Sequence, residues 1–334
     1  MATIGAMREY CTLFDSRYLT KALAMYRSLE AHATPFRLTA FTFDTTAESL
    51  LRRLRLEHLA IVPLADLEAH DTALAGVKGD RSRVEYCWTA TPTLPRYLFD
   101  TRPELSEVTY LDADLLFFSD PEALFAEMGE ASVLITPHRY PPEYAHHVSA
   151  GIYNVQFLTF RRTDDGIRTL EWWRERCLEW CYNRLEDGKL GDQKYLDDWP
   201  QRFRGVHVLG HPGGGLAPWN VLGHRVTSSP AGVLVDDAPL VFFHFHGLRL
   251  RRSGRHTLHP AGFHVPAATE RLVYRPYLDM LEAATIEIQQ VEPGFDAGVE
   301  DDPTRAERLR DLRVRIGEGA LRRVPALARL QRAP

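Results

Sequence analysis

The sequence has few cysteines and no long apolar run, and both shortages limit what the protein can be. Its four cysteines are Cys11, Cys87, Cys177 and Cys181, and their spacing does not form a disulfide framework. Cys177 and Cys181 would share a helix face, but no further ligands follow at zinc-site spacing, so we favour buried free thiols. No stretch reaches the roughly 18 to 20 apolar residues that span a bilayer. Residues 1–9 lack the basic-then-apolar order of a secretory signal, so we expect a cytoplasmic protein.

The sequence also lacks an excess of positive charge. Forty Lys and Arg residues face 45 Asp and Glu residues, which gives a formal net charge of -5. Proteins that bind nucleic acid without sequence preference need a broad basic surface to neutralise phosphates, so we expect no nucleic-acid partner. The length of 334 residues and a hydrophobic content of 45% are sufficient for one large α/β domain, or two smaller ones, with a substantial core.

Strand-like and helix-like segments alternate along the first half of the chain. Short apolar runs predict strands, and apolar residues three or four positions apart predict helices. Such alternation is typical of a mainly parallel sheet covered by helices on both faces. Thr45 or Thr46 could cap the second helix, and Pro92 and Pro95 should break or kink the third. The expected strands are 8–13, 36–43, 59–64, 108–111, 132–136, 152–160 and 241–245, and the expected helices are 18–32, 46–56, 83–99 and 163–185.

Two carboxylates interrupt the apolar run at residues 110–118. Residues i and i+2 of an extended chain point to the same side, so Asp112 and Asp114 should converge. Two buried carboxylates repel each other unless a divalent cation neutralises them, and hard oxygen ligands suit Mg²⁺ or Mn²⁺. The pair follows a strand of an α/β sheet, where ligands bind. The alternative interpretation is a solvated turn that carries two aspartates.

A histidine at the end of a late apolar strand is a candidate third ligand. His244 lies in the strand 241–245, and its imidazole would favour Mn²⁺ over Mg²⁺. His246 should point to the same side, and Gly247 permits a close approach of the backbone to a phosphate. The alternative is a strand-end histidine whose ring is merely hydrogen-bonded. Arginines that could neutralise a diphosphate follow at Arg249, Arg251, Arg252 and Arg255.

Over most of residues 8–250, these motifs resemble the retaining GT-A-fold glycosyltransferases of the glycogenin and lipopolysaccharide-galactosyltransferase type. The resemblance implies a Rossmann-like mixed sheet flanked by helices, with a helical extension at its C-terminal end. It also implies transfer of a sugar from a nucleotide diphosphate, with UDP favoured, Mn²⁺ or Mg²⁺ as the cofactor, and retention of anomeric configuration. Asp112 and Asp114 match the family's metal-binding Asp-x-Asp motif. His244 matches the third metal ligand in a His-[Phe/Tyr]-x-Gly element.

Further motifs follow in the family's order. Residues 149–154 resemble an Asn-Ala-Gly block beside the donor sugar, with Ser149 in the first position, and residues 191–193 resemble an Asp-Gln-Asp block, with Lys194 in the third. The resemblance implies that Asp192 contacts a sugar hydroxyl and that Gln193 lies nearest to the anomeric face. Trp219 and Asn220 resemble a Trp-Asn element. The implied donor-binding residues are Thr12, Leu13, Phe14, Asp15, Tyr18, Asp112, Ala113, Asn154, Gly247 and Arg249.

The predicted organisation has four parts. Residues 1–260 form the GT-A catalytic domain, 261–291 a helical extension, 292–303 an acidic linker with Pro and Gly, and 304–334 two basic amphipathic helices. Such helices can lie on an anionic membrane, here the inner face, or can pack on the domain or on a second copy of the chain. The sequence leaves these alternatives open.

Two other functions compete with glycosyl transfer. A sugar-nucleotide nucleotidyltransferase usually has a Gly-rich, basic first loop, which residues 12–17 lack. A non-catalytic module that binds nucleotide sugars or glycans would not need all of Asp112, Asp114 and His244. The acceptor could be a glycan, a lipid-linked saccharide, a protein or a small molecule. The loop histidines His146 and His147 could touch it or be solvated.

Overall fold

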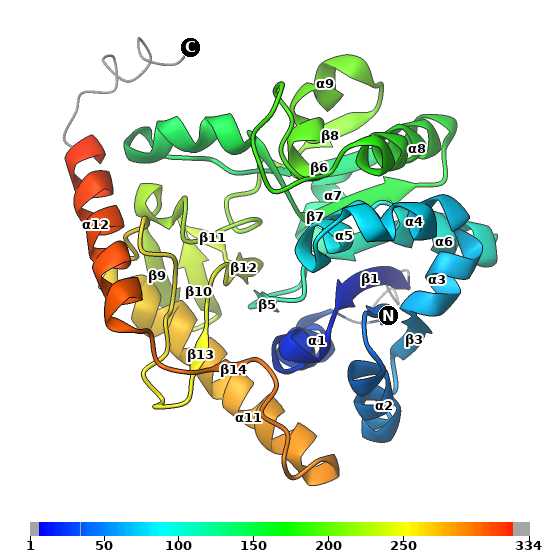
Figure 1. The fold of residues 1–334 in the computed structure, drawn as a ribbon. Coiled ribbons are helices and arrows are strands. Elements are labelled where there is room, and N and C mark those ends of the chain that lie inside the picture. The colour runs from blue at the N-terminus through cyan, green and yellow to red at the C-terminus, as the bar shows by residue number, and fades with distance from the viewer. Residues whose placement is uncertain (1–6, 34, 323–334) are drawn as a thin grey trace.

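The computed structural model describes residues 7–33 and 35–322, and these residues form an α/β domain around a mixed sheet (Figure 1). The strands are β1 (Arg8–Phe14), β2 (Phe36–Thr42), β3 (Leu59–Pro63), β4 (Glu107–Leu111), β5 (Leu115–Phe117), β6 (Val133–Pro137), β7 (Tyr153–Arg161), β8 (Val206–Val208), β9 (Val226–Ser229), β10 (Gly232–Val235), β11 (Ala238–Pro239), β12 (Phe242–His244), β13 (Leu250–Arg251) and β14 (Val299–Glu300). The seven-stranded sheet has the order β3-β2-β1-β4-β7-β6-β8. Only β7 runs antiparallel to its neighbours in this sheet, β4 and β6. The predicted mixed α/β sheet is confirmed.

Helices cover both faces of the sheet. They are α1 (Leu19–His32), α2 (Thr45–Leu54), α3 (Leu64–His70), α4 (Thr72–Val77), α5 (Arg83–Ala90), α6 (Thr93–Thr101), α7 (Glu122–Met128), α8 (Asp164–Glu179), α9 (Trp199–Arg202), α10 (Ala267–Thr269), α11 (Arg275–Val291) and α12 (Arg305–Arg322). The 3₁₀-helices are η1 (Ser16–Tyr18), η2 (Lys78–Asp80), η3 (Pro142–Ala150), η4 (Gln193–Asp198) and η5 (Val221–Gly223), and η6 (Glu270–Tyr274) is a π-helix. Residues of α1, α2, α7 and α11 belong to one core cluster, and residues of α3 to α6 and α8 belong to another.

Strand β1 shows how the alternation of side chains divides these two cores. Tyr10 and Phe14 point into the first cluster, whereas Cys11 and Leu13 point into the second. Successive residues of a strand face opposite sides, so a strand buried on both faces carries an almost continuous apolar run. This is why the sequence of β1 predicts a strand correctly.

The cap of α2 differs from its prediction. The N-cap of α2 is Asp44 rather than Thr45 or Thr46, because an Asp44 carboxylate oxygen accepts a hydrogen bond from the backbone N–H of Ala47 at 2.8 Å. The break that the prolines predicted in the segment 83–99 is confirmed, since this segment forms α5 and α6. The break falls at Pro92, which has no N–H to continue α5.

The aromatic helix α8 is shorter than predicted. It begins after its cap Thr163 and ends at Glu179 rather than at residue 185, because the next residue, Trp180, is extended. Trp173 is fully buried and packs edge-on against Trp199, so it belongs to the core. Cys177 and the following Cys181 are buried free thiols.

A short antiparallel pair of strands, β5 and β12, extends from the carboxyl end of the sheet (Figure 1). Phe242, Phe243 and His244 of β12 pair with Phe117, Leu116 and Leu115 of β5, respectively. This register places the end of the late apolar strand beside the turn that follows β4. Two segments that are far apart in the sequence therefore meet at one point.

The C-terminal part of the described chain folds back over this body. Helix α11 packs against α1, and β14 pairs with β13. Residues 292–303, predicted as a linker, include the buried Phe295 and all of β14. The two basic helical segments expected after Pro303 are a single helix, α12, as far as residue 322, and the remainder of the second segment lies outside the described residues. Among the described helices, none is both long and apolar enough to cross a bilayer.

Candidate active site

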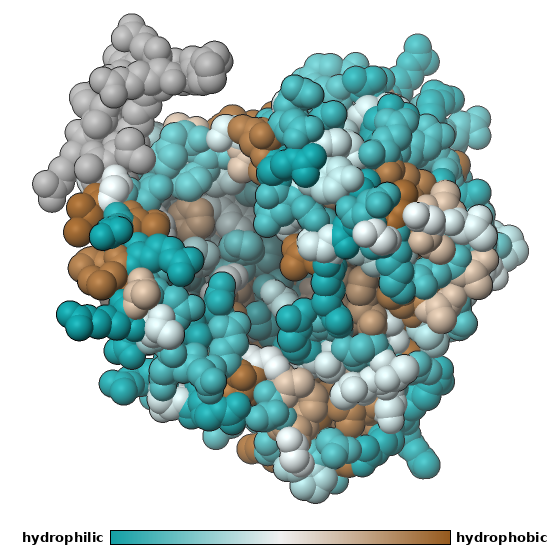
Figure 2. Space-filling model, viewed as in Figure 1, coloured by the Kyte–Doolittle hydropathy of each residue, from teal (hydrophilic) through white to brown (hydrophobic). Residues whose placement is uncertain are grey.

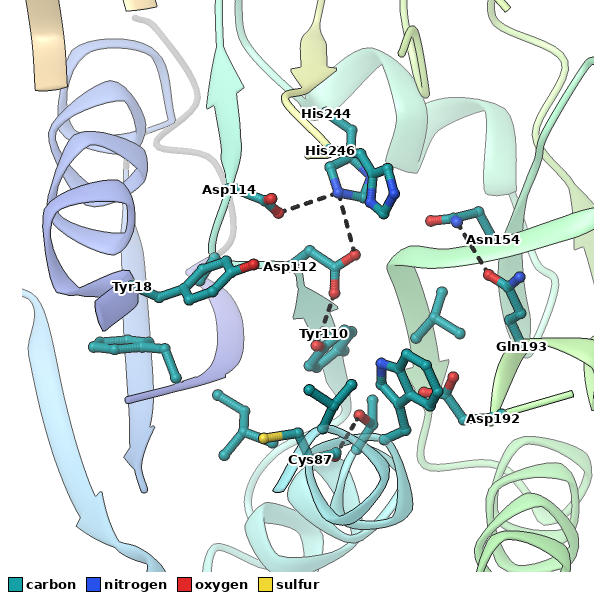
Figure 3. Close-up of a pocket in the computed structure, with 18 of the residues that line it drawn as sticks. Tyr18, Cys87, Tyr110, Asp112, Asp114, Asn154, Asp192, Gln193, His244 and His246 are labelled. Carbon is teal, nitrogen blue, oxygen red and sulfur yellow. Dashed lines mark hydrogen bonds and ion pairs between the residues drawn. The ribbon is translucent and has the colours of Figure 1, made fainter. Parts of the chain in front are cut away.

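The candidate site is a cavity of about 590 Å³ where β1, β4 and β12 end and where the antiparallel β7 begins (Figure 3). Its walls also include α5 and the start of η4. Most of the residues expected to bind the donor, to hold the metal or to act in catalysis line it: Leu13, Phe14, Asp15, Tyr18, Asp112, Ala113, Asp114, Asn154, Asp192, Gln193 and His244. The cavity lies at the carboxyl ends of the parallel strands, which is where ligands bind in open α/β sheets.

Two aspartates and a histidine converge in this cavity (Figure 3). His244 Nε2 lies 3.1 Å from Asp114 Oδ1 and 3.7 Å from Asp112 Oδ2. One candidate ligand atom from each of the three lies within 4.8 Å of the others, which is close enough to share a cation. The prediction that these three side chains meet is confirmed. Their donor set of two carboxylate oxygens and one imidazole nitrogen fits Mn²⁺ better than Mg²⁺.

Neighbouring side chains fix the orientation of the three groups. His244 Nδ1 lies 2.8 Å from Gln156 Oε1, so Nδ1 carries a proton to donate and Nε2 faces the aspartates. The Tyr110 hydroxyl donates to Asp112 Oδ1 at 2.8 Å. The edge of the Trp219 ring packs against the imidazole of His244, with 5.2 Å between ring centroids. The site is therefore held by hydrogen bonds and by aromatic packing.

The electrostatics of the three groups favour a positive charge between them. Burial raises the pKa of Asp112, and Asp114 adds to this effect. Burial also disfavours the charged form of Asp114, yet the charge of His244 and its hydrogen bond hold the pKa of this carboxyl well below its usual range. Burial lowers the pKa of His244, but the two aspartates outweigh this and raise it. A proton shared with His244 thus balances the carboxylates, and a divalent cation could replace that proton.

Asp192 and Gln193 lie on the other side of the cavity. Burial, together with the charge of Asp112, raises the pKa of Asp192 to about 8. Gln193 Oε1 accepts a hydrogen bond from Asn154 Nδ2 at 3.3 Å, and Gln193 Nε2 donates to the carbonyl of Ala150 at 3.0 Å. The structure therefore brings the two predicted catalytic residues and Asn154 to one wall (Figure 3).

The donor-binding residues expected between positions 12 and 18 lie at the opposite end of the cavity. Asp15 Oδ2 lies 2.7 Å from Arg17 NH2 and 2.9 Å from Arg83 Nε, so this carboxylate is already paired with two arginines. Leu13, Phe14 and Tyr18 border the cavity, whereas the fully buried Thr12 lies behind them.

Two residues expected to contact phosphate lie outside the cavity wall. Gly247 has φ +73, and a Cβ there would come within 2.6 Å of Pro260, so backbone conformation and packing already require glycine. Arg249 is exposed, and its NH1 lies 3.2 Å from Glu300 of β14. Arg251 and Arg252 also pair with acidic residues of the segment 296–301, which leaves these guanidinium groups turned toward that segment.

Sequence reasoning missed two residues that support the site. Gln156 holds His244, and its position two residues beyond Asn154 in β7 is a signal that could have identified it, since both face the same side. Lys21 of α1 is buried, donates to the Leu248 carbonyl at 2.9 Å and contributes positive potential at Asp114. Its helical position among apolar neighbours gave no such signal.

The comparisons with known proteins give relatives in sequence and in fold. No family model matches the chain. YfnD of Bacillus subtilis (strain 168) is 31% identical over 293 residues, which covers 87% of this chain and 94% of YfnD. YfnF of the same organism is 34% identical over 249 residues, covering 72% and 82%, respectively. Neither name states an activity.

Solved glycosyltransferase structures share the fold. The galactosyltransferase LgtC, in complex with donor and acceptor sugar analogues, aligns with a TM-score of 0.53 at 14% identity, covering 82% of this chain and 95% of LgtC. An active-site mutant of LgtC with glutamate in place of glutamine aligns with a TM-score of 0.51 at 13% identity and the same coverage. The described sheet and helices are therefore those of an LgtC-type GT-A fold, as predicted.

Proposed function

Because the chain belongs to the family of YfnD and YfnF and has the GT-A fold of LgtC, we propose that it is a glycosyltransferase. Its donor would be a nucleotide-diphosphate sugar, with UDP favoured, and its cofactor Mn²⁺. The observation that carries the proposal is the convergence of Asp112, Asp114 and His244 in a cavity whose far wall holds Asp192 and Gln193. A candidate cation site and two candidate sugar-contacting residues thus share one cavity.

In this proposal, each residue has a defined task. Asp112, Asp114 and His244 would hold Mn²⁺, which supplies positive charge where the departing nucleoside diphosphate becomes more negative. Asp192 would accept a hydrogen bond from a sugar hydroxyl. Gln193, fixed by Asn154 and the Ala150 carbonyl, would present its side chain to the anomeric face. The glutamine exchanged in the LgtC active-site mutant supports a role for a glutamine in this fold.

Retention of configuration follows in the proposal from the family resemblance. The donor sugar becomes oxocarbenium-like as the leaving group departs, and nearby oxygens can stabilise that charge. The acceptor would attack from the face that the diphosphate leaves. A glycan, a lipid-linked saccharide and a small molecule all remain candidate acceptors.

A nucleotide-sugar screen tests the proposed function. We expect UDP-sugars with Mn²⁺ to raise the melting temperature by several degrees, because a ligand that binds only the folded state stabilises it. The same mixture should release UDP slowly by hydrolysis, and EDTA should abolish both effects. Release of pyrophosphate from a nucleoside triphosphate and a sugar phosphate would instead identify a nucleotidyltransferase. A shift in melting temperature without any turnover would identify a non-catalytic binding module.

We also propose that α12 contacts the inner face of a membrane, near a lipid-linked acceptor. Leu309, Leu312 and Ile316 share one face of the helix and are 49%, 52% and 64% exposed, and hydrophobic residues gather over α12 at the left edge of Figure 2. Arginines flank this apolar face, as in helices that bind anionic lipid.

Liposome flotation tests this contact. The full chain should float with vesicles that contain anionic lipid, and a chain ending at Pro303 should stay at the bottom of the gradient. Neutral vesicles serve as the control, because their surface has no net negative charge to attract the arginines of α12. Equal flotation of the two chains would exclude α12 as the membrane contact, and dimerisation lost on truncation would indicate self-association instead.

A further inference from the structure

A second group of metal-ligand side chains lies outside the catalytic cavity, where α12 meets η3. His146 and His147 are consecutive residues of η3, and Glu318 lies near the end of the described part of α12. One ligand atom of each residue lies within 4.8 Å of the others. None of the three lines the cavity that contains Asp112 and His244.

The geometry centres on one carboxylate oxygen. Glu318 Oε1 lies 3.2 Å from His146 Nε2 and 3.5 Å from His147 Nε2. The centroids of the two imidazole rings are 4.2 Å apart. A single carboxylate oxygen thus faces two imidazole nitrogens, of which His147 Nε2 has no hydrogen-bond partner among the described residues.

We propose that His146, His147 and Glu318 bind a divalent ion of the zinc class, which fastens α12 to η3. Two imidazole nitrogens and one carboxylate oxygen are a ligand set that Zn²⁺ accepts, with water in the fourth position. A proton shared between Glu318 and one histidine would satisfy only one of the two rings. A metal ion can take a lone pair from all three groups.

Surrounding aromatic residues hold the ligands in place. The His147 ring stacks with Tyr140 and packs against Phe263, with ring centroids 5.8 Å and 5.2 Å apart, respectively. Tyr144 of the same turn is fully buried, and its hydroxyl accepts a hydrogen bond from the backbone N–H of His264 at 2.8 Å. A site whose ligands are already positioned loses little conformational entropy when an ion binds.

The position of the site indicates that the ion would hold α12 against η3. Residues 304–317 of the chain are exposed, whereas Glu318 is partly buried, with 13% of its side chain accessible. Residues 305–317 of α12 therefore have little apolar burial to hold them, and the ion would supply a contact at Glu318. The same turn, η3, ends at Ala150, whose carbonyl accepts from Gln193. The ion would thus also steady the wall of the catalytic cavity.

Metal counting on the full chain tests the proposal. After chelation and dialysis against Zn²⁺ at pH 7.5, we expect two ions per wild-type chain, since the catalytic group can also take Zn²⁺. Glu318→Gln should retain only one, with affinity at the second site reduced roughly 100-fold or more because a ligand is lost. His147→Ala should likewise retain only one ion per chain. Asp311→Asn, which removes the same charge from an exposed position of α12, should keep both ions.

Two further measurements separate this site from the catalytic one. Asp114→Asn should lose the ion at the catalytic site and keep the ion at Glu318. Loss of binding at one site can therefore be distinguished from loss at the other. Hydrogen exchange of α12 backbone amides should slow when Zn²⁺ is added to the wild type but not to Glu318→Gln. One ion per wild-type chain that Asp114→Asn abolishes, or α12 exchange unaffected by Zn²⁺, would overturn the proposal and leave an ordinary histidine–carboxylate ion pair.

Discussion

Asp114→Asn should lower kcat/KM for sugar transfer by about 1000-fold or more, because a neutral amide cannot hold the cation that balances the leaving diphosphate. The change keeps the size of a side chain that is only 6% exposed, so the fold should survive. Initial rates of UDP release and transfer with saturating Mn²⁺ measure the effect, and circular dichroism checks the fold.

Asp66→Asn is the matched control for that experiment. Asp66 is an exposed residue in the first turn of α3, far from the cavity lining, so its variant should transfer sugar at the wild-type rate. Activity of Asp114→Asn within tenfold of the wild type, combined with insensitivity to EDTA, would refute the cation site. Loss of activity in both variants would point to a general folding defect.

Asp192→Asn should have opposite effects on activity and on stability. At pH 8.5, where the Asp192 carboxyl is mostly ionised, transfer should fall by about 100-fold, because an amide oxygen is a weaker hydrogen-bond acceptor for the sugar hydroxyl than a carboxylate. The free energy of unfolding at pH 8.5 should rise, because burial of Asp192 beside Asp112 penalises the carboxylate and raises its pKa to about 8. A residue that serves catalysis at a cost to the fold is common in active sites.

The raised pKa of Asp192 determines how the stability of the protein changes with pH. The unfolded chain releases the proton of Asp192 near its ordinary pKa of about 3.9, whereas the folded chain keeps it up to about pH 8. Across that window, the folded state binds more protons than the unfolded state, so this group makes the protein less stable as pH rises. The melting-temperature gain of Asp192→Asn in EDTA should therefore be several degrees at pH 8.5 and vanish at pH 4.

A control variant on the same turn isolates the effect of burial. Asp198 is half-buried, with 48% of its side chain accessible, and pairs with Arg202 one helical turn away, so Asp198→Asn should change the melting temperature little at either pH. A loss of stability in Asp192→Asn at every pH would contradict the prediction. It would mean that Asp192 is ionised in the folded protein and stabilised by its neighbours.

Local patterns predicted the parts of the site that depend on neighbouring residues. Asp112 and Asp114 stand two positions apart after an apolar strand, and an extended chain has to point them the same way. The approach of His244 rests instead on the pairing of β5 with β12, for which only the family resemblance gave a reason. Binding of a cation by these three groups stays a prediction.

Tertiary contacts explain what the sequence could not predict. Arg249 was expected to face a diphosphate, but its guanidinium lies beside Glu300, which comes from a segment predicted to be a linker. The cap of α2 was assigned to threonine, although the neighbouring Asp44 has the better acceptor. The partner of Arg249 follows only from the three-dimensional arrangement, whereas the cap of α2 is a local competition between adjacent side chains of similar chemistry.

The register between β5 and β12 has a consequence for the order in which the protein matures. Asp114 and His244 belong to distant parts of the polypeptide and become neighbours only when these two short strands pair. A nascent or partly collapsed chain therefore offers an incoming ion two carboxylates without their imidazole. The ion should therefore bind with full affinity only after β5 and β12 have paired, and its binding free energy then stabilises the completed fold.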